Sequence, residues 1–169
     1  MKISKISKIE NKNLKIESSL LIDGILVGLA AGIVGACYRL LIGYSEKLVH
    51  YTADFIKTGF IYKIGLLLIL ILLALFSGFL LKREPMASGS GIPQVSAEIT
   101  GRLNSNPLRV LIYKITGGLT ASLGGLSLGR EGPSIQLGAM SGKLVSRILK
   151  KDSVKEKHLI TCGASAGLS

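Results

Sequence analysis

IGLLLILILLALFSGFLL, residues 64–81, decides the fold. None of its 18 residues carries a charge, and an α-helix of that length is about 27 Å long, close to the hydrocarbon thickness of a bilayer. Lys63 precedes the stretch, and Lys82 and Arg83 follow it, as is typical of the ends of a membrane span. The sequence therefore predicts a transmembrane helix over residues 64–81.

A second apolar stretch covers residues 18–43, where only Asp23 and Arg39 are charged. Its glycines repeat at every fourth position from Gly24 to Gly32, a spacing that lets two membrane helices approach closely. A secretory signal is an alternative, because lysines precede the stretch and residues 34–37 resemble a lipoprotein cleavage site. The chain stays apolar after this point and a second span follows, so a membrane helix is the favoured interpretation. A soluble core helix would have to be unusually long.

The overall composition agrees with a membrane protein. Hydrophobic residues make up 48% of the 169 residues, and the mean hydropathy is +0.49. The formal net charge of +11 could indicate nucleic acid binding. The basic residues, however, flank apolar stretches, and there is no Trp to stack on bases. We therefore expect a lipid bilayer as the partner, and no nucleic acid.

The distribution of charge predicts the orientation of the spans. Residues 1–17 are rich in lysine, and residues 44–62 mix both signs of charge, which indicates a loop. Two crossings would return the chain to its starting side, so the N-terminus and the Lys82–Arg83 pair would share one face. The positive-inside rule makes this face cytoplasmic. We expect residues 1–17 to be a cytoplasmic basic tail in a multi-pass protein of the cell membrane.

The amino-acid composition changes after Arg83. Twelve of the 21 glycines lie within residues 78–142, and all four prolines lie in this half of the chain. Interrupted backbone is tolerated at membrane depth only where it is buried in protein or lines a polar cavity. The sequence predicts short helices over residues 90–100, 107–123, 133–149 and from 156 onward. The fold class is therefore all-α, a polytopic membrane protein with long tilted spans and short broken half-helices.

Two pentapeptides in this region read as helix starts. In GSGIP, residues 89–93, Ser90 suits the N-cap and Pro93 suits the first turn. In GREGP, residues 129–133, Glu131 stands near the cap and Pro133 just inside the helix. Each helix N-terminus carries about half a positive charge, so two of them together form an anion site without a buried cation. Weak binding of this kind suits rapid transport.

Each of these motifs also has an alternative interpretation. Ser90 could be an ordinary N-cap, and its glycines could belong to a phosphate-binding loop, although the preceding strand and the GK[ST] ending are absent. Glu131 could form a surface ion pair with Arg130. Against this, Glu131 lies between apolar stretches, where an ionisable group is a functional candidate by default.

The two pentapeptides, in this order and after two spans, resemble the CLC family of voltage-gated chloride channels and chloride/proton exchangers. The glycine-rich end, residues 163–168, is similar to the family's next helix. The resemblance covers residues 18–169. It implies the N-terminal part of that family's membrane domain, truncated, because the family's GIFAP-like motif, its coordinating tyrosine and its inner proton-transfer glutamate would lie beyond Ser169.

By this resemblance, Ser90 coordinates the central chloride and favours it over nitrate, and Glu131 is the gate that also accepts protons. The same resemblance places anion-binding groups at these residues: Ser90, Gly91, Ile92, Arg130 and Gly132. It implies transport of chloride, with chloride and protons as partners and a homodimer in the full-length form. The alternative is a non-conducting membrane fragment with a structural or assembly role.

Other chemistry is not indicated. Cys37 and Cys162 lie far apart in apolar surroundings and are expected to be buried small hydrophobic residues. His50 and His158 are isolated, so no metal site is predicted. We expect no cofactor and no enzymatic activity.

Overall fold

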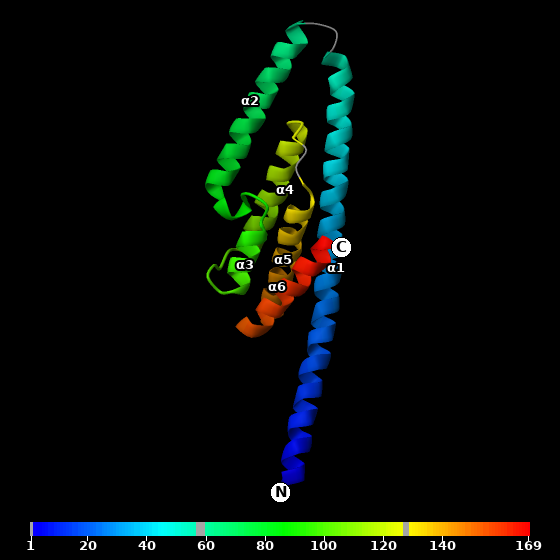
Figure 1. Ribbon diagram of the computed structural model, residues 1–169, viewed down its shortest axis with the longest axis vertical. Coiled ribbons are helices and arrows are strands. Elements are labelled where there is room, and N and C mark those ends of the chain that lie inside the picture. Colours follow the sequence, from blue (N-terminus) through cyan, green and yellow to red (C-terminus); the bar gives the residue numbers. More distant parts are fainter. Residues whose placement is uncertain (1, 57–59, 127–128) are drawn as a thin grey trace.

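The computed structural model describes residues 2–56, 60–126 and 129–169, with side chains for residues 20–52, 61–126 and 129–169. All the regular structure in these residues is helical, which confirms the predicted all-α class (Figure 1). The elements, in chain order, are α1 (Lys2–Ile56), α2 (Phe60–Arg83), the short 3₁₀ helix η1 (Pro85–Ala87), α3 (Ile92–Ile99), α4 (Pro107–Leu123), α5 (Glu131–Ile148) and α6 (Ser153–Leu168).

Helix α1 is longer than the sequence suggested. The loop predicted over residues 44–62 is wrong for residues 44–56, because α1 runs without a break to Ile56. Residues 57–59 lie outside the described residues. Residues 44–56 contain neither Gly nor Pro, and their charged residues are compatible with a helix that emerges from the membrane. The hydroxyl of Ser45 donates to the carbonyl of Leu41 at 2.9 Å, which satisfies it inside the helix.

Among the residues whose side chains are described, two helical segments are long and apolar enough to cross a bilayer, Leu20–Thr52 and Ile61–Arg83. None of the apolar window in the second segment is buried against the rest of the chain. Such a surface needs lipid or further protein to cover it. Helix α2 runs back antiparallel to α1 (Figure 1). The shorter helices α4, α5 and α6 pack against α1, and α4 also packs against α2. The 33 residues of the first segment are about 50 Å long, so this helix must tilt or extend beyond the hydrocarbon.

Helices α5 and α6 pack with their backbones in direct contact. A Cβ added at Gly142 would overlap the backbone of Leu159, and one at Gly167 would overlap that of Ser134. Gly138 and Gly163 face each other in the same way. These small residues are what permit two helices to approach so closely.

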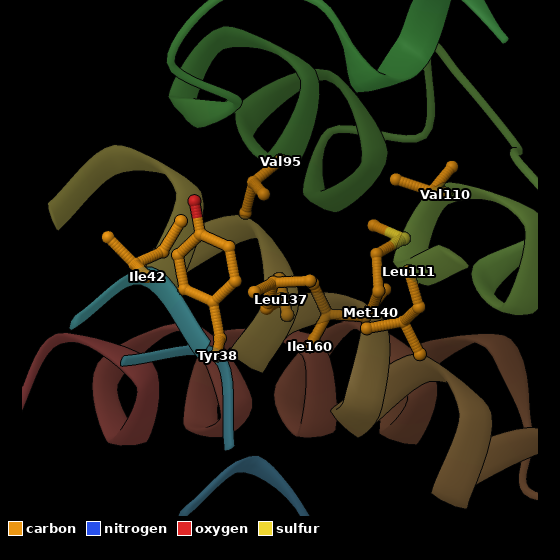
Figure 2. Close-up of a cluster of buried hydrophobic side chains, with 9 residues drawn as sticks. Tyr38, Ile42, Val95, Val110, Leu111, Leu137, Met140 and Ile160 are labelled. Atoms are coloured by element: carbon orange, nitrogen blue, oxygen red, sulfur yellow. The ribbon is translucent and has the colours of Figure 1, made fainter. Parts of the chain in front are cut away.

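The hydrophobic core forms around α5. Five helices contribute to it, and the side chains converge between α1, α3, α4, α5 and α6 (Figure 2). Its labelled members are Tyr38, Ile42, Val95, Val110, Leu111, Leu137, Met140 and Ile160. The expectation that Cys37 and Cys162 are buried is wrong, since both are exposed. Cys37 is next to the buried Tyr38, and one step along a helix turns a side chain by about 100° onto another face.

A buried ion pair joins α3 to α5. The ammonium of Lys143 binds the carboxylate of Glu98, and their side chains are only 1% and 2% exposed. The other carboxylate oxygen of Glu98 accepts the backbone N–H of Ser105 at 2.6 Å. Lys143 also donates to Oδ1 of Asn104 at 3.1 Å. Both charges are therefore well supplied with hydrogen bonds, which is the condition for tolerating them in a dry interior.

We predict that Glu98→Leu lowers the free energy of unfolding by about 3–5 kcal/mol, because it leaves the Lys143 ammonium buried without its counter-charge. The double variant Glu98→Leu, Lys143→Leu should recover most of this loss, since no lone charge remains. Thermal or denaturant unfolding in detergent measures both effects. A double variant no more stable than the single one would contradict this account.

Candidate functional site

The segment between α2 and α3 is a tight loop built on glycine. Gly89 has a φ of 63° and Gly91 has a φ of 89°, both in the left-handed region where other residues are strained. Helix η1 precedes them, and its end is closed by the N–H of Ser88 donating to the carbonyl of Pro85 at 3.1 Å. The GSG part of the first motif is therefore a conformational requirement of this turn.

Helix α3 begins one residue later than the sequence suggested. Its N-cap is Gly91 and not Ser90, and no side chain caps it. Gly91 takes this place because its left-handed conformation leads directly into the helix. Pro93 lies in the first turn, as predicted. The N–H groups of Ile92 and Gln94 have no carbonyl in their own helix to bond.

Helix α5 begins at the second motif. Arg130 is its N-cap, and Glu131 is its first residue. Pro133 falls within the first turn, as predicted, although the helix begins two residues before the predicted start at residue 133. The N–H groups of Glu131 and Gly132 are consequently free of intrahelical partners. The carboxylate side chain of Glu131 is exposed.

The two helix starts lie against each other. A Cβ added at Gly132 would be 2.7 Å from the carbonyl oxygen of Ser90 and 3.0 Å from its Cβ. Gly91 likewise packs against the side chain of Gln136, one turn further along α5. The N-terminal ends of α3 and α5 therefore meet, although 41 residues separate Ser90 from Glu131 in the sequence.

Arg130 has a partner that the sequence analysis did not anticipate. Its guanidinium binds the carboxylate of Glu46 on α1, so the alternative of an ion pair between Arg130 and Glu131 is wrong. Both partners are partly exposed, with side-chain exposures of 45% and 41%. Glu46 lies in the part of α1 that was predicted to be a loop, which explains why this contact was missed.

Lys114 is a further residue of the site that sequence reasoning did not select. It lies on α4, is 5% exposed, and its ammonium donates to the carbonyls of Ala87 at 3.1 Å and Gly89 at 2.7 Å. A signal was present, since a lysine within the apolar stretch LRVLIYKI, residues 108–115, needs a polar partner. The ammonium ties α4 to the loop that carries Ser90.

A cavity of about 640 Å³ opens beside this loop, between α2 and α4. Its polar lining includes Tyr38, Lys114 and Thr120, and Gly89 and Pro133 bring both motifs to its wall. The hydroxyls of Ser77 and Thr120 are 2.9 Å apart and link α2 to α4 at its edge. Among the described residues, no group of His, Cys, Asp and Glu could hold a metal ion.

These features define a class of protein: a polytopic membrane protein whose broken helices meet end to end at a polar site. The sequence profile of the family described as "Voltage gated chloride channel" matches residues 73–169. The chain belongs to this family.

The chain is also similar to curated proteins. The H(+)/Cl(-) exchange transporter ClcA of Vibrio cholerae is 35% identical over 161 residues, which covers 89% of this chain and 33% of the relative. ClcA of Vibrio parahaemolyticus is 35% identical over 154 residues, and ClcA of Citrobacter koseri is 32% identical over 157 residues, with the same coverage. The chain therefore spans about one third of the length of these relatives.

We predict that Gly132→Ala lowers the free energy of unfolding by about 1–3 kcal/mol, because the new methyl group must displace the backbone of Ser90. Gly117→Ala is the matched control, since a Cβ there meets nothing within 4 Å. In a helix interior that exchange should stabilise by about 0.5–1 kcal/mol. Thermal unfolding in detergent gives both values. If Gly132→Ala is instead more stable than Gly117→Ala, the close contact is contradicted.

Proposed function

We propose that this chain forms one side of a chloride pathway, with the anion held where the N-termini of α3 and α5 meet. The observation that carries the proposal is the contact between Gly132 and Ser90, which brings the two helix ends together. Their free N–H groups and partial positive charges favour an anion at this place. The binding groups proposed are Ser90, Gly91, Ile92, Arg130 and Gly132.

The strength of such a site suits transport. Each helix end contributes about half a charge, and both are partial charges that belong to fixed peptide groups. An anion is attracted without meeting a full cation in its path, because the Arg130 guanidinium is occupied by Glu46. We assign Arg130 to the site through its backbone at the N-cap of α5. A chloride ion can then leave as readily as it enters.

Glu131 is proposed as the gate and proton acceptor. It begins α5 directly beside Gly132, so its carboxylate can occupy the same positive field that would attract chloride. Protonation removes the negative charge and lets the side chain leave the anion's place. This supports coupling of proton and chloride movement, which the name of the ClcA relatives, H(+)/Cl(-) exchange transporter, states for those proteins.

The topology proposed follows the distribution of charge. With α1 and α2 antiparallel, the lysine-rich residues 1–17 and the Lys82–Arg83 pair would face the cytoplasm. We propose a homodimer in the full-length form. A structural or assembly role without conduction is the second candidate, favoured by the apolar window of residues 61–83, none of which is buried against the rest of the chain. Chloride flux in liposomes that contain only this chain distinguishes the two.

We predict that Glu131→Gln abolishes the pH dependence of chloride flux, because an amide can neither carry the proton nor compete as an anion. The measurement is chloride efflux from liposomes reconstituted with the protein in its full natural length, across about pH 3–6, the range in which carboxyl groups ordinarily titrate. Glu84→Gln is the control, because Glu84 is a partly exposed carboxylate that directly follows α2 and lies outside the proposed site. An unchanged pH profile in Glu131→Gln counts against the gate.

We predict that Ser90→Ala lowers the preference for chloride over nitrate by about tenfold, since a hydrogen bond to a charged partner is worth about 1.5–3 kcal/mol. Ser96→Ala, an exposed serine on α3, is the control and should leave the preference unchanged. Competition between the two anions in the flux assay gives the ratio. A ratio equal to that of the unmodified protein would exclude the hydroxyl from the site.

A further inference from the structure

Four consecutive carbonyl groups precede Ser90, and every one of them accepts a side-chain hydrogen bond. Nε2 of Gln136 donates to Met86 at 2.7 Å. Lys114 donates to Ala87 and Gly89, as described above. Nε2 of Gln94 donates to Ser88 at 3.1 Å. The donors come from three different helices, α5, α4 and α3, so they surround the loop.

The direction of these carbonyls decides the direction of the neighbouring N–H groups. In a planar trans peptide, the carbonyl oxygen of one residue and the N–H of the next point in opposite directions. No cis peptide occurs in the described part of the chain. Holding the Ser88 and Gly89 carbonyls toward Gln94 and Lys114 therefore turns the N–H groups of Gly89 and Ser90 the other way.

The side-chain amides of both glutamines act as hydrogen-bond donors to these carbonyls. A flipped amide would place its oxygen against a carbonyl oxygen, so the carbonyl selects the orientation of the side chain. In this orientation Oε1 of Gln94 and Oε1 of Gln136 are both buried, with no hydrogen-bond partner among the described residues. The hydrogen bond to a loop carbonyl is therefore the contact that the described residues supply to each glutamine.

We propose that Gln94 and Gln136 are positioning residues which, with Lys114, hold the carbonyls of residues 86–89 turned away from the anion. This proposal rests on the proposed chloride site. A carbonyl oxygen facing the site would repel chloride, whereas the opposite end of the same peptide attracts it. The glutamines do not touch the ion. They act by fixing which end of each loop peptide the ion meets.

The test compares the chloride affinities of Gln94→Met and Gln136→Met with that of the protein in its full natural length, by calorimetric titration in detergent. Methionine keeps the volume and removes the donor. We expect each variant to raise the chloride Kd about three- to tenfold, as the loss of one hydrogen bond implies, and the double variant to raise it further. Leu137→Met, equally buried on α5, is the control for repacking and should leave Kd within about twofold.

A conservative variant supplies the second readout. In Gln94→Glu the new side chain donates only when its carboxyl group is protonated. The ratio of its chloride Kd to that of the unmodified protein should therefore be close to one at low pH and rise as the pH increases. If Kd is unchanged in both methionine variants while their unfolding temperatures fall, the glutamines are merely structural and the inference fails. If the unmodified protein binds no chloride, the proposed function fails instead.

Discussion

The site depends on the close approach of Gly132 to the backbone of Ser90. The N-termini of α3 and α5 can meet only because no side chain stands between them at this position. Any Cβ there would separate the two helix ends and weaken the combined field of their free N–H groups, since that field falls off within the first turn of a helix. At this contact a missing side chain lets the two helix ends approach, and their approach combines the partial positive charges of both ends.

Helix α5 is the scaffold that holds this contact in place. Its first turn carries Glu131 and Gly132, its second turn carries Gln136, and its middle carries Lys143, which binds Glu98 of α3. The opposite side of the helix lies against α6, with glycines at the contact. Helix α3 has only eight residues, too few to be stable by itself. Its position is therefore set by the ion pair, by the core residue Val95 and by the loop before it.

Among the described residues, each buried charged side chain has a specific partner. Lys143 is paired with Glu98, and Lys114 donates to two loop carbonyls. Lys151 binds Asp23 of α1 at 2.6 Å, so the acidic residue within the first apolar stretch is also accounted for. In a membrane protein such contacts are strong constraints, because an unpartnered charge at this depth is expensive. The same contacts connect elements far apart in the sequence and so define the tertiary arrangement.

Much of the helical architecture could be predicted from sequence. The apolar run at residues 64–81 lies within α2, and α4 has the predicted bounds Pro107–Leu123. Pro93 and Pro133 lie in the first turns of α3 and α5, as predicted. The incorrect predictions concern positions where the residues are compatible with two local conformations. The mixed charges of residues 44–56 were read as a loop and belong to α1, and the N-cap of α3 is Gly91 in place of Ser90. The two cysteines were assigned to the interior from their apolar neighbours alone, although neighbouring residues of a helix face different surroundings.

By itself, the amino-acid sequence determined the membrane class, the helix starts and the candidate residues, because hydrophobic runs, prolines and glycines act locally on the backbone. Only the tertiary structure decided which of these features meet. It placed Gly132 on Ser90, Arg130 on Glu46, Lys143 on Glu98, and the side chains of three helices on the loop carbonyls. Contacts between distant residues arise when several helices pack at once, and no local pattern in one chain encodes that pairing.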